Sequence, residues 1–311
     1  MKNFAFVFPG QGAQKVGMGK DFFVDNPASR EMFENADRIL GYSISEKIFN
    51  GPADELKKTE ITQPAVFLAS AACLAALKNK LPGIQPAYVA GHSLGEYTAV
   101  YASGALDFES TLKLVAQRGR IMAKITGGGM AAIIGLEDDK VREICKNLVG
   151  VVEPVNFNSP GQIVIAGEKE SIAKACEAAK AAGAKRALPL AVSGPFHSSL
   201  MKPAQDEFAE FIQSVEFTAA NVPVVANCSA QPSTETGGIK QALLDQFVSP
   251  VMWVDSVKFM AGKGVDTFIE IGPGNIISGL IKRIMPGART FSVGDAASLA
   301  SAVGELNRIV N

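Results

Sequence analysis

Short runs of apolar residues, each closed by glycine, proline or a polar residue, recur along the chain. The first is Phe4–Phe8, which ends at Pro9-Gly10. Continuous runs of this length are typical of strands buried on both faces of a parallel sheet. The same pattern predicts strands at residues 87–90, 222–227, 267–271 and 290–293.

Stretches with helical spacing separate these runs. Asn26-Pro27 supplies an N-cap and a first-turn proline for a helix that continues to Leu40. Residues 63–77 are apolar nearly all round, which predicts a helix buried in the core. Further helices are predicted from about residue 96, at 108–124, 241–247, 255–261 and 276–285, and at the end of the chain. Strands alternating with helices predict an α/β fold with a parallel sheet covered on both faces.

The pattern changes after the glycine run at residues 126–129. The order that follows is a strand at 130–134, a helix at 138–148, strands at 151–157 and 162–166, a helix at 168–182 and a strand at 185–192. This β-α-β-β-α-β order is that of a ferredoxin-like unit. The sequence therefore predicts a small subdomain at residues 126–195, inserted in a large α/β domain made of residues 1–125 and 196–311.

Composition narrows the class of protein. At roughly 150 residues per domain, the 311 residues correspond to about two domains. A net charge of −1 gives no basic field for nucleic acid or an anionic membrane. The longest apolar stretch, 65–77, is too short to span a bilayer, and no secretory or transit pattern opens the chain. The four cysteines form no CxxC pair, so we expect reduced thiols and a cytoplasmic location.

Residues 91–95 (GHSLG) match the G-x-S-x-G pattern, between a predicted strand and a predicted helix. In that context the serine lies on a tight turn, with its hydroxyl exposed and the N–H groups of the next helix close by. Ser93 is therefore a candidate nucleophile. The alternative is a glycine-rich turn in which Ser93 only caps the helix.

The chain has two histidines, His92 and His197, which excludes a multi-histidine metal site. A serine needs a base to attack at neutral pH. His92 adjoins Ser93 in sequence, so we expect its side chain to point away from the hydroxyl and to have a packing role. His197 is the remaining candidate base. The spacing of Asp and Glu residues indicates no third, orienting acid.

The polar loop at residues 9–14 follows the first strand. It lacks the third glycine of a dinucleotide motif and the lysine of a P-loop, so the nucleotide interpretation fails. Ligands bind at the carboxyl ends of strands in α/β sheets, so Gln11 can donate a hydrogen bond into a site there. The alternative is a structural turn.

Arg118, 25 residues after Ser93, stands among apolar neighbours. Composition alone favours a solvated or paired arginine at this position.

Several motifs together resemble the malonyl-CoA:acyl carrier protein transacylase family, and the resemblance covers nearly the whole chain. They are residues 8–14 (FPGQGAQ), 91–97 (GHSLGEY), 117–120 (QRGR), 158–162 (NSPGQ), 194–197 (GPFH) and 270–274 (EIGPG). The resemblance implies an α/β-hydrolase-like core with a ferredoxin-like insertion, the organisation that the apolar pattern also predicts.

The resemblance assigns the catalytic pair. Ser93 is similar to the family's nucleophile and His197 to its base. In the family a backbone carbonyl, not a carboxylate, holds the imidazole, which agrees with the lack of a third acid. The segment at 249–253 (SPVMW) resembles the one that supplies this carbonyl, and it assigns the carbonyl to Met252. Relatives often have glutamine there, so any side-chain role of Met252 is open.

The resemblance also implies the residues that bind the substrate. Gln11 and the N–H of Leu94 resemble oxyanion-hole donors, and Arg118 resembles the residue that pairs with the free malonyl carboxylate. Asn158 matches a polar position near the active site. Phe196 corresponds to a phenylalanine that accompanies malonyl rather than branched acyl groups.

The implied activity is transfer of a malonyl group from malonyl-CoA to the phosphopantetheine thiol of acyl carrier protein, through a malonyl-serine intermediate and for fatty acid elongation. It needs no cofactor or metal. We expect a monomer with no nucleic acid or membrane partner. Three alternatives stay open: a serine thioesterase or hydrolase, an acyltransferase of a polyketide pathway, and a non-catalytic binding module.

Overall fold

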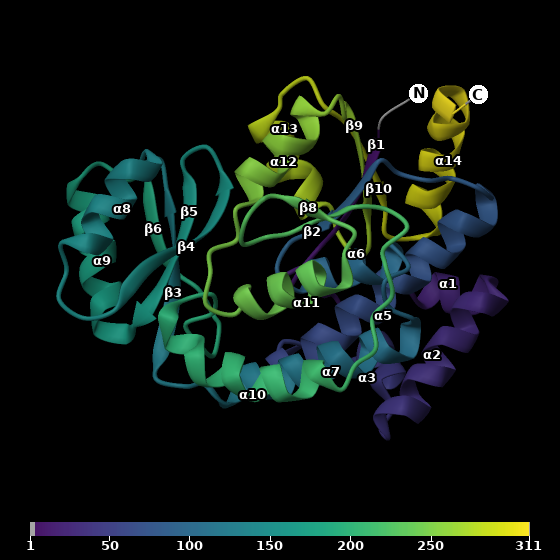
Figure 1. Ribbon diagram of the computed structural model, residues 1–311, viewed down its shortest axis with the longest axis horizontal. Helices are drawn as coiled ribbons and strands as arrows, with labels where there is room; N and C mark the ends of the chain where they lie inside the picture. Colours follow the sequence, from purple (N-terminus) through teal and green to yellow (C-terminus); the bar gives the residue numbers. More distant parts are fainter. Residues whose placement is uncertain (1–3, 311) are drawn as a thin grey trace.

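The structure is a computed structural model that describes residues 4–310. Residues 1–3 and 311, which belong to the predicted large domain, lie outside the described residues. Two separate sheets organise the described part of the chain (Figure 1). One is a mostly parallel sheet of six strands in the order β10-β9-β1-β2-β7-β8, and the other is an antiparallel sheet of four strands.

The large sheet has the short apolar strands that the sequence predicts. Its strands are β1 (Phe4–Phe8), β2 (Tyr88–Gly91), β7 (Val224–Val225), β8 (Pro232–Ser233), β9 (Thr267–Ile271) and β10 (Arg289–Val293). Only β8 runs antiparallel to its neighbour. Alternate residues of β1 enter different cores: Phe6 and Phe8 pack in the main apolar cluster, Ala5 and Val7 in a second one. Both faces of the sheet are therefore buried, as predicted.

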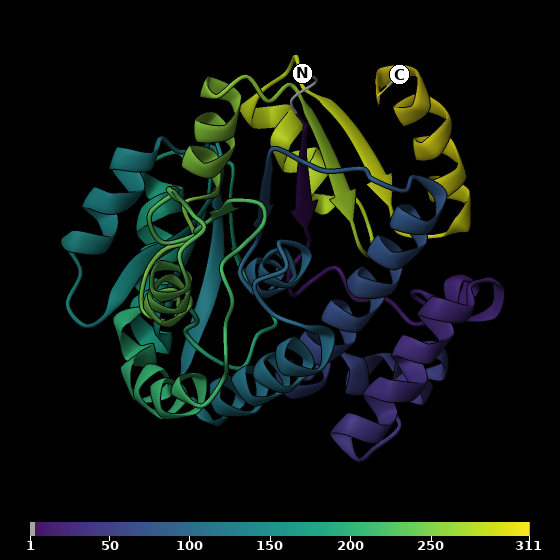
Figure 2. The same cartoon turned by 45° about the vertical axis from the view of Figure 1, so that its right-hand side comes forward.

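Helices cover both faces of this sheet (Figure 2). They are α1 (Lys20–Asp25), α2 (Pro27–Leu40), α3 (Ile44–Asn50), α4 (Ala53–Leu56), α5 (Thr59–Lys80), α6 (Leu94–Ala102), α7 (Phe108–Lys124), α10 (Lys202–Gln213), α11 (Thr236–Asp245), α12 (Trp253–Gly262), α13 (Ile276–Ile284) and α14 (Ala296–Val310), with a short 3-10 helix at Ser199–Met201. Helix α7 has the predicted bounds, and Asn26 caps α2 through its side chain.

Helix α5 is the buried core helix. By length and composition it could cross a membrane, with a mean hydropathy of 1.5 over its most apolar window. However, 89% of that window is buried inside the protein. Core helices of folded domains have this combination of apolar composition and burial.

The inserted segment forms the second sheet, seen in teal at the left of Figure 1. Its elements are β3 (Gly128–Ile134), α8 (Asp138–Lys146), β4 (Val152–Ser159), β5 (Gln162–Glu168), α9 (Lys169–Ala181) and β6 (Arg186–Pro189). The strand order β4-β5-β3-β6 is that of a ferredoxin-like sheet. The fold class is confirmed, and we propose that the insertion is bounded at residues 126–195 as the sequence predicts.

The two sheets are joined close to the candidate site. The N–H of Val251 donates to the carbonyl of Val155, and the N–H of Phe157 donates to the carbonyl of Val251. These bonds pair β4 with the segment between α11 and α12. The large domain and the insertion thus share main-chain hydrogen bonds at this point.

The main differences from the predicted elements are local. Strand β7 is shorter than the predicted 222–227, because the chain turns away after Val225 and carries Asn227 under the neighbouring strand β2. Strand β6 ends at Pro189, before the predicted residue 192. Helices α1, α3, α4 and α10 had no predicted range. Three of these, α1, α3 and α4, are short, so their apolar positions give little periodicity to detect.

Candidate active site

Ser93 lies at a sharp turn between β2 and α6, in a conformation that serine rarely adopts. Its φ is 52° and its ψ is −109°, in a region where side chains other than glycine are strained. The turn needs close backbone contacts: a Cβ on Gly95 would lie 2.2 Å from the carbonyl oxygen of Phe8. The Ser93 hydroxyl makes no capping hydrogen bond to α6. The alternative of a simple helix cap is therefore wrong.

The fold brings Ser93 and His197 into contact. Ser93 Oγ lies 2.7 Å from His197 Nε2, and His197 Nδ1 lies 2.7 Å from the backbone oxygen of Gln246. Because a carbonyl oxygen can only accept, Nδ1 carries the proton and Nε2 accepts from the Ser93 hydroxyl. This is the arrangement that a serine nucleophile and its base require.

The carbonyl that holds His197 belongs to Gln246, so the assignment to Met252 is wrong. The Met252 carbonyl accepts the N–H and the hydroxyl of Ser256, each at 2.9 Å, and so closes the first turn of α12. The chain leaves α11 at Asp245 and passes the imidazole at the next residue. The correct carbonyl therefore lies at the end of α11 and not at the start of α12.

The environment of His197 keeps the imidazole neutral. Burial, and then the positive charge of Arg118, lower the pKa of His197 to about 3. The hydrogen bond to the Gln246 carbonyl acts in the opposite direction but is smaller. At neutral pH the ring is therefore unprotonated and able to take a proton.

Arg118 is buried beside the nucleophile. Its Nη2 donates to Ser93 Oγ at 3.2 Å and to Gln246 Oε1 at 2.8 Å, and its Nη1 donates to Gln63 Oε1 at 2.7 Å. Arg118 Nε is buried and has no acceptor among the described residues. The interpretation of Arg118 as a solvated residue is wrong. A buried guanidinium at this distance can bind an anionic group attached to Ser93.

A network of buried polar groups lies beneath the turn. Asn227 Oδ1 accepts the N–H of Ser93 and Asn227 Nδ2 donates to the carbonyl of Gly91, both at 2.7 Å. Gln246 Nε2 donates to Glu96 Oε2 at 2.6 Å and to the Ser93 carbonyl at 3.0 Å. We call Gln63, Glu96, Arg118, Asn227 and Gln246 the buried floor. It links the nucleophile, the base and the guanidinium by direct hydrogen bonds.

The two candidate oxyanion donors lie on either side of the turn. We call the turn at residues 91–95 the elbow. Gly10 lets the loop after β1 lie against it, since a Cβ on Gly10 would be 2.3 Å from the His92 carbonyl oxygen. Gln11 follows it, and its Nε2 donates to Thr59 Oγ1 at 3.3 Å. Leu94 is the first residue of α6, where N–H groups have no carbonyl within the helix. The Leu94 N–H is thus next to Ser93 in the chain, whereas the Gln11 amide is bonded to Thr59 in this structure.

Asn158 is in contact with the other histidine, His92. Its Oδ1 is 2.7 Å from His92 Nε2. Both residues line a cavity of about 200 Å³ between the large sheet and the insertion, together with Gln11, Asn156 and Gln162. We call these five residues the mouth. Its named side chains are polar and neutral, since burial lowers the pKa of His92.

Phe196 is buried beside His197, with 6% of its surface exposed, and packs in the main apolar cluster. A Cβ on Gly194 would lie 3.0 Å from the Phe196 ring. The following residue, His197, has a φ of 66°. A tight turn packed on Phe196 thus presents the imidazole to Ser93.

Sequence reasoning missed four members of the buried floor. Gln63 and Glu96 stand in segments that are otherwise apolar or small, and a polar residue at a predicted core position signals a buried hydrogen-bonding role. Asn227 and Gln246 give no such local signal. They reach the elbow only because β7 and α11 end next to it.

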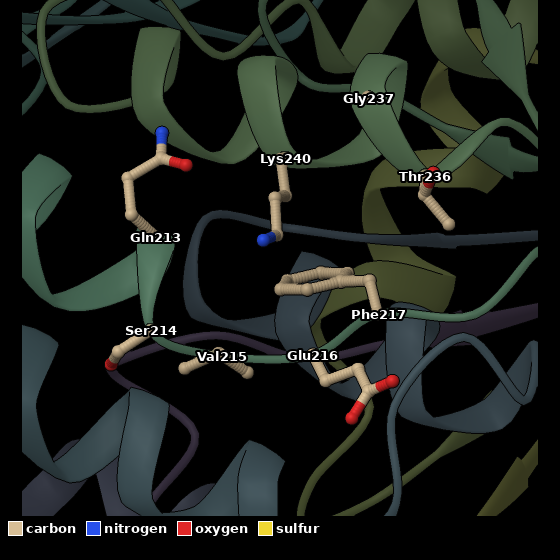
Figure 3. A pocket seen from close by; sticks show the side chains of 8 residues that line it. All are labelled: Gln213, Ser214, Val215, Glu216, Phe217, Thr236, Gly237 and Lys240. Atoms are coloured by element: carbon tan, nitrogen blue, oxygen red, sulfur yellow. The ribbon is translucent and has the colours of Figure 1, made fainter.

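No group of three or more His, Cys, Asp or Glu side chains that could hold a metal occurs within residues 4–310. Another hollow, of about 410 Å³, lies between the end of α10 and the start of α11 (Figure 3). It is lined by Gln213, Phe217 and Lys240 among others, and contains none of the candidate residues.

Comparisons with known proteins agree with this geometry. Residues 5–307 match the family model described as the acyl transferase domain. The chain is 46% identical over 299 residues to a malonyl CoA-acyl carrier protein transacylase of Staphylococcus aureus, which covers 94% of this chain and 96% of the relative.

Two solved structures are similar over nearly the whole chain. One is an acyl-carrier-protein S-malonyltransferase from Burkholderia pseudomallei, with a TM-score of 0.94, 49% identity and coverage of 98% of this chain and 100% of that one. The other is a malonyl-transacylase in complex with its type II PKS acyl-carrier protein, with a TM-score of 0.95, 43% identity and the same coverage.

Proposed function

The chain belongs to the acyl transferase family, and we infer that it transfers malonyl groups from malonyl-CoA to the pantetheine thiol of an acyl carrier protein. The relatives named above carry this activity in their names. The observation that carries the inference is the hydrogen-bonded set of Ser93, His197 and Arg118. It combines a nucleophile, a neutral base and a buried cation.

In the first half-reaction Ser93 Oγ attacks the thioester carbon of malonyl-CoA while His197 Nε2 takes the hydroxyl proton. The tetrahedral intermediate collapses, the C–S bond breaks, and the CoA sulfur leaves with the proton from His197. A malonyl ester of Ser93 remains. A positioned base of this kind contributes about 10²–10⁴ in rate.

The second half-reaction reverses the first with a different thiol. His197 takes the proton of the carrier-protein thiol, the sulfur attacks the ester, and Ser93 leaves with the proton restored. The two thiols use the same site in turn, which gives ping-pong kinetics. Gln11 and the N–H of Leu94 donate to the developing oxyanion, and each such donor contributes on the order of 10²–10³.

Arg118 selects the acyl group in this proposal. Its guanidinium pairs with the free malonyl carboxylate, and an acetyl group has none to offer. A buried cation left without its anion is costly, by about 3–5 kcal/mol when one partner of a buried pair is removed. Asn158 contacts substrate from the mouth, and Phe196 limits the space beside the α-carbon.

We propose that the malonyl carrier protein made in this way supplies fatty acid elongation, in the cytoplasm, by a monomeric enzyme without a cofactor. Supply of a polyketide pathway is the second candidate. It is favoured by the similarity to the malonyl-transacylase solved with a type II PKS carrier protein.

Mass spectrometry after incubation with malonyl-CoA tests the intermediate. We expect a malonyl adduct on the peptide that contains Ser93, discharged by carrier protein faster than by water. A Ser93→Ala variant is the control and should carry no adduct. An adduct on that variant would overturn the assignment of Ser93 as nucleophile. Equal rates of adduct discharge with and without carrier protein would indicate a hydrolase.

A further inference from the structure

All the hydrogen-bond acceptors of Arg118 in the described residues are electrically neutral. Its Nη1 and Nη2 bond to the amide oxygens of Gln63 and Gln246 and to the Ser93 hydroxyl. The guanidinium carbon also lies 5.1 Å from the centre of the Tyr97 ring and 5.4 Å from that of Phe247. Buried arginines are usually paired with carboxylates. Here several contacts hold the cation, and none of these hydrogen bonds is to a carboxylate.

We propose that Gln63 and Gln246 are specificity-determining residues, which fix Arg118 with neutral oxygens so that its charge stays available for the carboxylate of the acyl group. This rests on the proposed role of Arg118 in binding that carboxylate. It goes further by assigning the malonyl preference also to residues whose amide oxygens hold the guanidinium of Arg118. A carboxylate at either position would occupy Arg118 and compete with the substrate.

The orientation of Gln246 supports the proposal. Its Oε1 accepts from Arg118, and its Nε2 donates to Glu96 Oε2. Arg118 can only donate and a carboxylate accepts, so this is the orientation in which both bonds are made. The amide therefore stands between the buried acid and the buried cation. Burial also raises the pKa of Glu96 to about 7, which weakens its negative charge at neutral pH.

Gln63 offers the cleaner test, because its side chain bonds to neither Ser93 nor His197. It lies on α5, which packs beside α7, the helix that carries Arg118 (Figure 1). Besides accepting from Arg118, its Nε2 donates to the sulfur of Met122 at 3.4 Å, a weak contact. A Gln63→Glu substitution keeps the shape and replaces a neutral acceptor by a charged one.

The experiment compares kcat/KM for malonyl-CoA and acetyl-CoA. In Gln63→Glu we expect malonyl transfer to fall by about 100-fold or more, as when a buried ion pair loses a partner, with acetyl transfer within about threefold of wild type. The loss should lie in KM for malonyl-CoA. Retained acetyl transfer shows that the variant folds and that Ser93 and His197 still work together. A matched control is Gln213→Glu, which adds the same charge at an exposed position outside the site.

A double variant separates this proposal from the one on which it rests. If Arg118→Ala alone keeps the wild-type malonyl-to-acetyl ratio, the role of Arg118 fails. If Arg118→Ala lowers the ratio, Gln63→Glu added to it should change the ratio no further, since both act through one guanidinium.

Two results would overturn the proposal. One is a wild-type malonyl-to-acetyl ratio in the Gln63→Glu variant. The other is that Gln63→Glu lowers this ratio as much in the Arg118→Ala background as in the wild type. If Gln63→Glu does not fold, Gln63→Met tests the same contact, because it removes the neutral oxygen that holds Arg118 Nη1. We expect the malonyl-to-acetyl ratio to fall, and a wild-type ratio would count against the proposal.

Discussion

The buried floor and the mouth both adjoin the turn at residues 91–95, and they differ in almost every physical respect. The floor belongs to the large domain, and its residues are buried and joined by direct hydrogen bonds. The mouth is partly supplied by β4 and β5 of the insertion and opens on a cavity of about 200 Å³. The floor contains Arg118 and Glu96, whereas the mouth has no Asp, Glu, Lys or Arg among its five residues.

This difference indicates a division of tasks. Charges act more strongly where water is excluded, so the floor can position the nucleophile and select an anionic acyl group. The mouth has only neutral donors and acceptors, so it suits the uncharged part of a substrate arm. Changes in the floor should therefore alter the chemical step and the acyl preference. Changes in the mouth, apart from the proposed oxyanion donor Gln11, should have smaller effects and should act on KM.

The largest contrast is expected between the two histidines. His197→Ala should lower kcat by about 10²–10⁴, because the base for Ser93 is lost. His92→Ala, in the mouth, should change kcat far less, since His92 bonds to Asn158 and not to Ser93. Steady-state kinetics with carrier protein checks both. Similar losses in kcat would contradict the division.

A second contrast compares two asparagines. Asn227→Ala leaves the buried Ser93 N–H and Gly91 carbonyl without partners, which should lower the free energy of unfolding by about 2–3 kcal/mol. It should also lower kcat, because the strained elbow loses the two hydrogen bonds from Asn227 that hold it in place. Asn158→Ala should change the free energy of unfolding and kcat only slightly, and should raise KM. Urea unfolding and steady-state kinetics on the two variants measure these changes. A stable, fully active Asn227→Ala variant would refute the role of Asn227 in holding the elbow.

The floor should also make stability depend on pH through Glu96. Burial raises the pKa of Glu96 in the folded state to about 7, above its ordinary value of 4.5. The contribution of Glu96 to the free energy of unfolding is therefore fully present below pH 4.5. As the pH rises through 7, the free energy of unfolding falls by up to about 3 kcal/mol. Glu96→Gln should remove this loss, so wild type and variant should diverge between pH 5 and pH 8. Parallel unfolding curves at both pH values would contradict it.

The smallest effect is expected for the pH dependence of Ser93 acylation, which depends on the protonation of His197. With a pKa of about 3, His197 stays neutral down to low pH. Acylation of Ser93 by malonyl-pantetheine, which has no phosphate to titrate, should therefore not fall between pH 8 and pH 5. A histidine with a pKa of 6.5 would lose about 30-fold over that range. A stopped-flow measurement of the acylation rate distinguishes the two.

Much of the fold was predictable because it is encoded locally. The apolar strand Phe4–Phe8, the capped helix after Asn26 and the glycine run at 126–129 each follow from neighbouring residues. The predicted range of strand β7 was too long, because nothing nearby in the sequence marks where the chain leaves the sheet. The positions of Ser93 and His197 were predictable from the elbow pattern, the scarcity of histidine and the family's motifs.

Local patterns were enough to predict the alternation of strands and helices, the inserted subdomain, the serine on its turn and the candidate base. The packing of distant elements was needed to find the carbonyl that holds His197, which is that of Gln246 and not that of Met252. It also decided that Gln63, Asn227 and Gln246, far apart in the chain, meet Arg118 and Ser93. The reason is that periodicity and turn chemistry act over a few residues. Hydrogen bonds between the ends of β7, α11 and β2 depend on how distant elements pack.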